Sequence, residues 1–540
     1  MATTVGDVSY PRDERTLFAR KATGLVKGWS VRDAFIYSAF SINLITLGLF
    51  IFSYAVFVPN GSLMWAIILS GAYLVFQAIT YASLIAAMPR AGGDYVWISR
   101  TLGGGIGFVL AACGWWFILW HWVPIYANIL NIMVLGPLSA IVGWDRGVTY
   151  WSSHNGVFTS SMIVALMASL LVAAGVRAYA RFQKICFYGG CVGLLIMFIL
   201  LVVHSKSDFI SAFNAQAHDV YHTSGDAYAA TAKAGSAGTY ASLGSFHFGQ
   251  IVLLIPILFF FNLWSNWGAT LYGEVRGASD FRKNIYAMGG ALLATTAVAA
   301  IFFGLFAHTF GWQWYHASNA AYWAGTGPLG VFPYPGTLVA FFTGSAALQF
   351  IIVGILSLWF FGWVGTVFLS STRVVFAAAF DRVLPEAAAK VSAKGVPYGA
   401  LALMLIPSIP ISYFYAYNTK FSSWTFDATL VIAITFLGSA VSAAIFPWRR
   451  PDIYNASPIA KYKVAGIPLI TAAATAFTAI LVFALYKWFS DSVYGVNFRN
   501  SEYYMAVLYG VAIAVYVASW LYRRSQGLSL KMVYGEIPAE

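Results

Sequence analysis

The sequence predicts an all-α polytopic membrane protein with twelve transmembrane helices. Of its 540 residues, 60% are hydrophobic and only 9% are charged, whereas soluble domains carry about a quarter charged residues. This composition excludes a soluble globular domain and a disordered chain. A membrane-spanning helix needs about 20 mostly apolar residues, and twelve runs meet this requirement. They lie at roughly 33–58, 63–87, 105–138, 157–174, 185–204, 249–275, 284–308, 337–376, 398–416, 427–446, 466–489 and 503–522.

The basic residues predict the orientation of these runs. With twelve spans, both termini lie on the same side of the membrane. That side carries 25 of the 31 Lys and Arg residues, and only six lie on the other side. Because cytoplasmic segments of membrane proteins are enriched in Lys and Arg, we expect a multi-pass protein of the cell membrane with cytoplasmic N- and C-termini. The net charge of +12 is then explained by the basic residues that orient the chain in membrane lipid. We therefore expect no nucleic-acid partner.

The first apolar run is interrupted near its middle by small and polar residues. Residues 41–48 read SINLITLG, and the sixth run has a similar interruption at residues 259–270, which read FFFNLWSNWGAT. Broken helices at matching places in two halves of a membrane protein are typical of a transporter's binding site, because the opened backbone exposes amides and carbonyls. The alternative is that these residues form close contacts between neighbouring helices.

One histidine lies near the middle of the third run. His121 belongs to residues 114–128, which read GWWFILWHWVPIYAN. Ionisable residues at this depth are costly and usually face a cavity, so His121 is a candidate cavity-lining residue or proton acceptor. A neutral histidine that donates a hydrogen bond to a neighbouring helix is an equally good interpretation.

The connections between the runs show no catalytic or metal-binding chemistry. Residues 205–248 form the longest hydrophilic connection, and His218 and His222 within it have a spacing that suits a metal only if the segment is helical. A solvated loop is the favoured interpretation. The sequence has no phosphate-binding glycine loop, zinc-protease helix motif or serine elbow. We therefore expect no enzymatic activity, no cofactor and no metal site.

Three short motifs at the ends of particular runs resemble one known family. Residues 88–95 (MPRAGGDY) follow the second run, residues 273–276 (GEVR) end the sixth, and residues 371–385 (STRVVFAAAFDRVLP) end the eighth. In this order they resemble the amino acid permeases of the amino acid–polyamine–organocation superfamily. The resemblance covers roughly residues 25–525.

This resemblance implies a fold and a class of function. It implies a LeuT-like fold of two inverted five-helix repeats with broken first and sixth helices, followed by two additional helices. It also implies a secondary active amino acid transporter that works by alternating access. The corresponding segments are an N-terminal cytoplasmic segment (1–32), a first repeat (33–204), an extracellular loop (205–248), a second repeat (249–446), two C-terminal helices (447–522) and a cytoplasmic tail (523–540).

The resemblance also implies where the substrate binds. In the family, amides of the opened first helix bind the substrate carboxylate, and carbonyls of both broken helices bind its amine, as the dipoles of the helix ends favour. Trp264 is interpreted either as a lid over the site or as ordinary packing. The implied substrate-binding residues are Leu44, Thr46, Leu47, Gly48, Phe260, Leu263, Trp264 and Asn266, to which we add His121.

One departure from the family bears on coupling. Proton-coupled members carry a lysine in the fifth span where this chain has Gly190, and glycine has no ammonium group to occupy a sodium position. Neither the family's proton site nor its sodium site is evident. Coupling to a proton or sodium ion therefore stays open beside exchange or facilitated movement, with His121 as the nominated proton acceptor.

The side chains expected around the site indicate a neutral substrate. The central turns of the first, third, sixth, eighth and tenth runs contain no Asp, Glu, Lys or Arg, and an unpaired charge at this depth costs at least about 2.5–3.5 kcal/mol. Bulky apolar or aromatic amino acids therefore fit best, and small ones fit if the aromatic side chains face lipid. The alternatives are an amine, purine or other organocation carrier, or a channel or non-transporting sensor. The aromatic side chains concerned are Phe260, Phe261, Trp264, Trp116 and Trp120.

Overall fold

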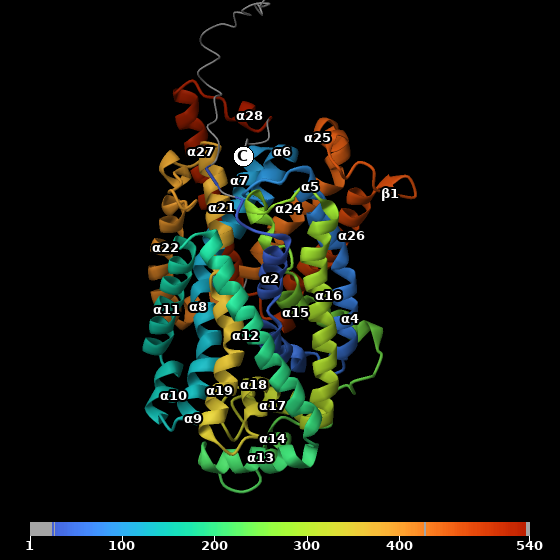
Figure 1. Ribbon diagram of the computed structural model, residues 1–540, viewed down its shortest axis with the longest axis vertical. Coiled ribbons are helices and arrows are strands. Elements are labelled where there is room, and N and C mark those ends of the chain that lie inside the picture. The colour runs from blue at the N-terminus through green and yellow to red at the C-terminus, as the bar shows by residue number, and fades with distance from the viewer. Residues whose placement is uncertain (1–23, 26, 426–427, 536–540) are drawn as a thin grey trace, which may run out of the picture.

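The computed structural model describes residues 24–25, 27–425 and 428–535. Within these residues, twelve helical spans are long and apolar enough to cross a membrane, so the predicted all-α polytopic fold is confirmed. Most of them run along the long axis of the molecule (Figure 1). The cytoplasmic segments expected at 1–32 and 523–540 lie partly outside the described residues.

The first half of the chain forms five of these spans, several of which consist of consecutive helical segments. Two short helices, α6 (Asp94–Thr101) and α10 (Asp145–Ser152), lie between spans. In order, the spans consist of α2 (Val31–Ile42), η1 (Leu44–Gly48), α3 (Leu49–Phe52) and η2 (Ser53–Phe57); α4 (Leu63–Tyr73) and α5 (Val75–Ala87); α7 (Gly104–Ala112), η3 (Cys113–Phe117), α8 (Ile118–Leu130), η4 (Asn131–Leu135) and α9 (Gly136–Ile141); α11 (His154–Ala173); and α12 (Val176–Val203).

The second half forms the other seven spans. These consist of α15 (Phe248–Asn262) and η5 (Trp267–Glu274); α16 (Phe281–Phe306), η6 (Ala307–Gly311) and α17 (Trp312–Trp323); α19 (Ala346–Leu356), α20 (Leu358–Val364) and α21 (Thr366–Phe380); α22 (Tyr398–Tyr417); α23 (Thr419–Trp424) and α24 (Ala428–Arg449); α26 (Leu469–Ser490); and α27 (Arg499–Ser525). The connecting elements are α13 (Lys206–Asp219), α14 (Ala227–Ala234), α18 (Pro335–Ala340), η7 (Glu386–Ala389), α25 (Pro451–Ala456), β1 (Lys463–Val464), β2 (Ile467–Pro468), η8 (Ser492–Tyr494) and α28 (Leu530–Val533).

The two ends of the bundle are covered by different elements. α13 and α14 lie across one end, at the bottom of Figure 1, whereas α6, α25 and α28 lie at the other. We call these the α13 end and the α6 end. The connection 205–248, expected as a solvated loop, thus contains two helices. The sequence next to each N-terminus favours the start of the helix. Ser205 and Asp208 form a capping box at α13, and Asp226 caps α14.

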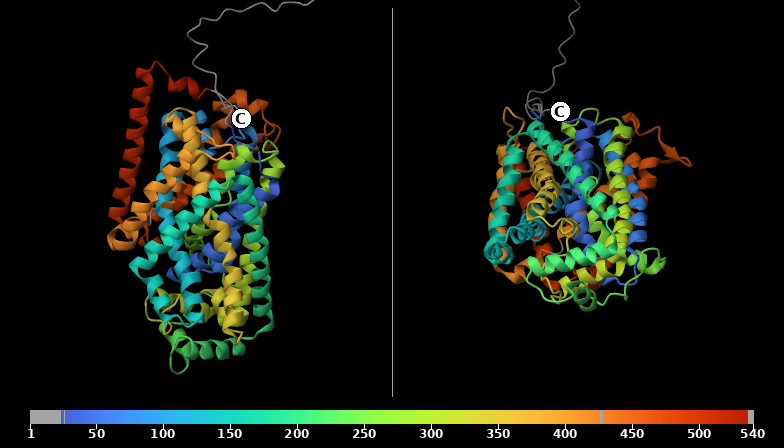
Figure 2. Two further views of the ribbon diagram at one scale, coloured as in Figure 1. Left: turned by 60° about the vertical axis from the view of Figure 1, so that its left-hand side comes forward. Right: turned by 60° about the horizontal axis from the view of Figure 1, so that its bottom comes forward.

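The first broken span lies deepest in the bundle. In the first span, 89% of the most hydrophobic 18-residue window is buried, compared with 17% in the last. Figure 2 shows α27, the last span, at the edge of the molecule. The first span is therefore surrounded by protein, where a break in a membrane helix is tolerated.

The two broken spans are joined to each other at the α6 end. The Trp29 amide donates to the Glu274 carbonyl at 3.1 Å, and the Arg276 amide donates to the Trp29 carbonyl at 2.9 Å. The Glu274 carboxylate in turn accepts from Arg373 of α21 at 2.6 Å, and both side chains are 1% exposed. Backbone pairing and a buried ion pair thus fix these ends to α21.

Candidate functional site

The first span is broken at Asn43, which has a left-handed backbone with φ of 50°. Few residues other than glycine adopt this conformation, and asparagine is among those that tolerate it. α2 therefore ends at Ile42, and the π-helical turn η1 begins at Leu44. Asn43 Oδ1 accepts from the Thr46 amide at 3.1 Å, and Nδ2 donates to the Trp359 carbonyl at 3.2 Å. Asn43 thus ends one helix, caps the next and anchors the break to α20.

The sixth span is broken between α15 and η5. Gln77 of α5 reaches into this gap, where its Nε2 donates to the Leu263 carbonyl at 2.8 Å and to Asn266 Oδ1 at 3.0 Å. The Trp264 indole folds back and donates to the Phe260 carbonyl at 2.8 Å. These side chains supply hydrogen bonds to backbone carbonyls at the open end of a helix, which lack the amide donors of a continuing turn.

The two breaks lie against each other. A Cβ atom at Gly48 would lie only 2.8 Å from the Phe261 ring, so the missing side chain at residue 48 lets η1 and α15 touch. Nearer the α6 end, a Cβ atom at Gly268 would lie 3.2 Å from the Tyr37 ring. The interruptions noted in the sequence are therefore true helix breaks, and they are in contact.

Tryptophan rings pack around the break in the sixth span. Trp264 lies edge-on to Trp122 of α8 at 5.1 Å and to Trp267 at 5.6 Å between ring centroids. Trp122 and Trp267 stack at 5.4 Å, and Trp267 also contacts Trp115 at 4.4 Å. Edge-on and stacked arrangements of this kind are favourable for aromatic rings. We call these four rings the tryptophan stack; it fills the space between the third and sixth spans.

Comparison with known proteins gives the family of this twelve-span bundle. A sequence model described as "Amino acid permease" matches residues 34–515. The chain belongs to the amino acid permease family. It is also similar to the Asc-type amino acid transporter 1 of Mus musculus and to that of Rattus norvegicus. Each is 24% identical over 429 residues, which cover 76% of the permease and 69% of the relative.

Most of the predicted substrate-binding residues of the permease lie at the two breaks. Those of the first span form η1, and those of the sixth lie at the end of α15 or in the gap that follows. All except Phe260 are buried. The residues that the fold brings together are Leu44, Thr46, Leu47, Gly48, Leu263, Trp264 and Asn266, with the carbonyl of Phe260.

Three aromatic side chains expected around the site face other helices of the permease. The Phe260 ring lies 5.4 Å from Trp488 of α26. Trp116 and Trp120 each donate from Nε1 to the Leu403 carbonyl of α22 at 3.1 Å. Their places are taken by rings that the sequence analysis did not nominate. Of these, Trp122 lies two turns after Trp115 on one helix face, and this spacing was the signal available for it.

His121 also faces away from the breaks. Its Nδ1 lies 3.0 Å from the Phe117 carbonyl, and its Nε2 lies 2.5 Å from the Tyr504 hydroxyl of α27. The ring lies 6.1 Å from the Phe421 ring. A neutral imidazole that donates from Nδ1 and accepts at Nε2 satisfies both contacts. This geometry agrees with the alternative in which His121 bonds to a neighbouring helix.

The position of the family's lysine is filled by another side chain. A Cβ atom at Gly190 would lie 2.8 Å from Trp359 Nε1, and this indole donates to the Gly190 carbonyl at 2.9 Å. The Trp359 ring also packs edge-on against Phe40 at 5.4 Å. Because Asn43 donates to the carbonyl of the same tryptophan, Trp359 joins the fifth span to the first break.

Aromatic side chains close the permease toward the α13 end. Tyr54 stacks on Trp323 at 4.8 Å, and Phe50 contacts both Trp323 and Phe332 at about 6 Å. The Trp323 indole donates to Ser53 Oγ at 3.1 Å. We call Phe50, Tyr54, Trp323 and Phe332 the aromatic plug. It covers the half of the first span that lies toward the α13 end.

Polar contacts close the permease toward the α6 end. The Trp267 indole donates to the Thr366 carbonyl at 3.1 Å, and Ser370 Oγ donates to the Trp267 carbonyl at 3.0 Å. The hydroxyls of Ser370 and Tyr37 share a hydrogen bond of 2.7 Å. The two broken spans are thereby held against α21. Side-chain contacts therefore cover the two breaks on both sides.

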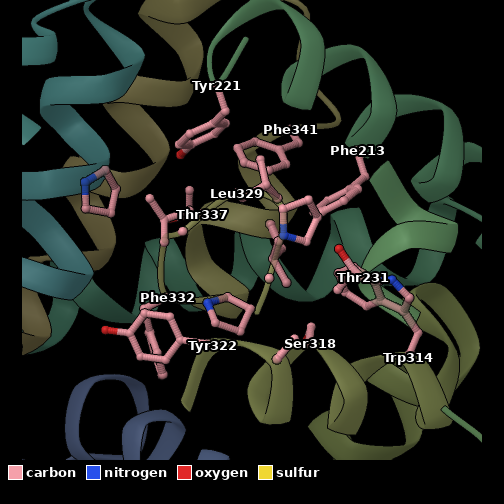
Figure 3. A pocket seen from close by; sticks show the side chains of 18 of the residues that line it. Phe213, Tyr221, Thr231, Trp314, Ser318, Tyr322, Leu329, Phe332, Thr337 and Phe341 are labelled. Carbon is pink, nitrogen blue, oxygen red and sulfur yellow. The ribbon is translucent and has the colours of Figure 1, made fainter. Parts of the chain in front are cut away.

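A cavity of about 110 Å³ lies beside the aromatic plug. Figure 3 shows rings from separate elements around it, including Phe213 of α13, Tyr322 of α17 and Phe341, which follows α18. Phe332 belongs to both the cavity wall and the plug. Within the described residues, the buried Thr337 hydroxyl in this wall has no hydrogen-bond partner. The cavity therefore lies next to the plug, on the α13 side of the breaks.

Proposed function

We propose that this permease carries neutral amino acids with bulky apolar or aromatic side chains across the cell membrane by alternating access. The observation that carries this proposal is the contact between the two breaks. An opened helix offers amides to a carboxylate and carbonyls to an ammonium group, and these two charges are common to all amino acids. The family of the chain and its similarity to amino acid transporters support the same class of substrate.

The turn η1 is the proposed site for the substrate carboxylate. Amides in the first turn of a helix have no helical acceptors, and Gly48 has no side chain to obstruct the backbone. In the structure, Asn43 accepts from the Thr46 amide through its side chain and from the Gly48 amide through its carbonyl. The Phe261 ring lies against Gly48. We expect this ring to move when the carboxylate binds.

The carbonyls of Leu44, Phe260 and Leu263 are the proposed ligands of the substrate amine. Two of them already accept hydrogen bonds from side chains, because Trp264 donates to Phe260 and Gln77 donates to Leu263. A carbonyl oxygen has a second lone pair, so the amine shares or replaces these donors. The Trp264 indole then acts as a placeholder for the amine in the empty site.

The surroundings of the breaks favour an uncharged substrate side chain. Within the described residues, neither η1, the gap in the sixth span nor the tryptophan stack contains an Asp, Glu, Lys or Arg. A charged substrate side chain would stay unpaired there, at a cost of at least about 2.5–3.5 kcal/mol. The rings of Phe261 and of the tryptophan stack instead offer apolar surface to a bulky side chain.

Exchange or facilitated movement is the proposed mode of transport. Trp359 fills the position at which the family's proton-coupled members carry a lysine, and it has no charge to place there. The distribution of Lys and Arg supports a cytoplasmic α6 end with both termini on that side. Exposed apolar side chains on α12, α22 and α27 suit contact with membrane lipid.

Counterflow in proteoliposomes tests this proposal. Vesicles loaded with unlabelled leucine should accumulate radiolabelled leucine, and phenylalanine, isoleucine and methionine should compete with it. Arginine, lysine, glutamate and simple amines should compete at least tenfold less well, because their extra or missing charges do not suit the two breaks. Accumulation that is abolished by arginine would contradict the neutral pocket. A channel or a sensor would give no counterflow at all.

Cysteine labelling tests the orientation. Ala230 and Lys390 are exposed and lie at opposite ends of the bundle. In intact cells, a membrane-impermeant maleimide should label Ala230→Cys, and it should label Lys390→Cys only after permeabilisation. The native cysteines Cys113 and Cys186 are buried, whereas Cys191 is half-buried, so Cys191→Ala is added to both variants to keep the background low. The reverse pattern would place the α6 end outside.

A further inference from the structure

Acidic side chains are rarely buried, and those buried here differ in their partners. The described residues contain four buried acids, and three of them have a basic partner. The exception is Asp94, which is 0% exposed. Within the described residues, no Lys, Arg or His forms an ion pair with it. The paired acids are Asp33 with Lys184 at 2.8 Å, Glu274 with Arg373 at 2.6 Å and Asp381 with Arg100 at 2.5 Å.

The Asp94 carboxylate is held by three hydrogen bonds from three different spans. Oδ1 accepts from the Tyr81 hydroxyl of α5 at 2.6 Å and from Ser439 Oγ of α24 at 2.5 Å. Oδ2 accepts from the Trp115 indole of η3 at 3.0 Å. Since tyrosine, serine and tryptophan all donate here without a formal charge, no group compensates the charge of the carboxylate itself.

Asp94 is also joined to the break in the sixth span. Its neighbour Gly92 donates an amide hydrogen bond to the Thr270 carbonyl of η5 at 2.9 Å. Trp115, which holds Oδ2, contacts Trp267 of η5 at 4.4 Å. Asp94 therefore lies where the second, third, sixth and tenth spans meet, at the α6 end of the site.

We propose that Asp94 is a proton-binding site that controls opening of the α6 end, binding a proton while it is buried and releasing it to water when that end opens. This inference rests on the proposed function, because it needs a transporter that alternates between occluded and open states. No other reactant is required: a hydronium ion supplies the proton that one carboxylate oxygen binds, and water accepts it on release.

The direction of the effect follows from burial. Desolvation raises the pKa of Asp94 from 3.8 to about 6, although its three hydrogen bonds oppose the shift. An open α6 end would return the carboxyl to water and to its ordinary pKa. The occluded state then binds the proton more tightly than the open state. Its extra stability is fully present below pH of about 4 and is lost as the pH rises through about 6.

The other ionisable groups near Asp94 are tyrosines or members of ion pairs. Tyr81 faces it from α5, and a tyrosine hydroxyl titrates near pH 10. Burial raises the pKa of Tyr95 on α6 even further above 10. η3 and α24 contribute Trp115 and Ser439, which do not titrate. The remaining charges on α6, η5 and α21 lie in ion pairs, Arg100 with Asp381 and Glu274 with Arg373.

Exchange in proteoliposomes at equal pH on both faces tests this inference. Radiolabelled leucine exchange by the unmodified protein should fall about tenfold between pH 7 and pH 5, as linkage between pKa values of about 6 and 3.8 requires. Asp94→Asn cannot ionise, so its exchange should be slow at pH 7 and independent of pH. A pH-independent rate in the unmodified protein, or the original pH profile in Asp94→Asn, would overturn the inference.

A second pair of variants separates a proton site from a structural hydrogen bond. Ser439→Ala removes a donor to the ionised carboxylate, so the midpoint of the pH profile should rise by about one unit. Ser442→Ala is the matched control on the same helix, because its buried hydroxyl has no partner within the described residues; its midpoint should stay in place. An unmoved midpoint in Ser439→Ala refutes the proton site even if Asp94→Asn fails to fold. Absence of leucine exchange at every pH would instead refute the proposed function.

Discussion

The two breaks at the centre of this permease are stabilised in different ways. In the first span, Asn43 supplies the left-handed backbone, the cap of η1 and the bond to α20. In the sixth span, the open carbonyls are held by side chains, Gln77 from α5 and Trp264 from the span itself. The first break is thus stabilised by the backbone conformation of one residue, whereas the sixth is stabilised by side chains that bond to its carbonyls.

This difference indicates which break responds to substrate. The first break persists as long as Asn43 keeps its conformation, so we propose that it is a fixed surface for one end of the substrate. At the sixth break, we propose that the substrate amine shares the carbonyls with the side chains that bond to them or displaces these side chains. We therefore expect substitutions at the first break to remove function or stability, and substitutions at the sixth to change affinity.

The largest effect is expected for Gly48→Leu. The new side chain would enter the space of the Phe261 ring, 2.8 Å from the position of Cβ, and cover the amides proposed for the carboxylate. Leucine counterflow should fall at least 100-fold, while insertion into the membrane is retained. The matched control is Gly304→Leu on α16, where no atom lies within 4 Å of the added Cβ. Full activity in Gly48→Leu would move the site elsewhere.

A smaller loss is expected for Asn43→Ala. Alanine cannot cap η1, and the loss of a cap lowers the free energy of unfolding by about 0.5–2 kcal/mol. Alanine also tolerates a φ of 50° poorly, which lowers this free energy by about another 1 kcal/mol. The melting temperature in detergent should drop, and exchange should fall about tenfold. Asn43→Gly removes the same side chain but accepts the backbone, so it should recover part of the lost stability. Equal melting temperatures for the two variants would mean that the left-handed conformation costs nothing here.

The sequence predicted the breaks but not what faces them. Polar residues at 41–48 and 259–270 are out of place in a membrane helix, so the break points were readable. By contrast, large aromatic side chains lie on several faces of the third span, so its hydrophobic pattern alone does not distinguish a face toward the breaks from one toward α22 or α27. Trp116, Trp120 and His121 were nominated by depth alone, and their faces became evident only from the packing.

Distant partners set a second limit on the sequence analysis. Gly190 was recognisable as a missing lysine, but Trp359, which fills its place, lies 169 residues away in the chain. Likewise, the hydrogen-bond donors to the Asp94 carboxylate, Tyr81, Trp115 and Ser439, come from three different spans. The α13 and α14 helices were readable locally, since their capping residues precede them directly.

A moderate change in affinity is expected for Trp264→Phe. Phenylalanine keeps a ring in the tryptophan stack but leaves the Phe260 carbonyl without its indole donor. An unpaired buried carbonyl costs about 1–3 kcal/mol, and the substrate amine would remove part of that cost. The KM for leucine should therefore fall about fivefold. Trp267→Phe is the control, because its indole donates to the Thr366 carbonyl, which is not a proposed ligand. A higher KM in Trp264→Phe would argue that the ring itself binds the substrate.

The smallest functional effect is expected for His121→Gln, because neither break contacts this side chain. His121 bonds to Phe117 within its helix and to Tyr504 of α27. Leucine exchange should stay within about twofold, and the midpoint of its pH profile should not move. Stability should fall by about 0.5–1.5 kcal/mol, the usual net worth of a hydrogen bond.

A double-variant cycle gives this prediction its control. Tyr504→Phe removes the partner hydroxyl, so it should cost a similar amount of stability, and combining it with His121→Gln should add little further loss. If His121 were instead the proton acceptor, His121→Gln would flatten the pH profile and Tyr504→Phe would leave that profile almost unchanged. The same pH series of leucine exchange is measured on Asp94→Asn. Comparison of the two variants then shows whether the titrating group is His121 in the third span or Asp94 in α6.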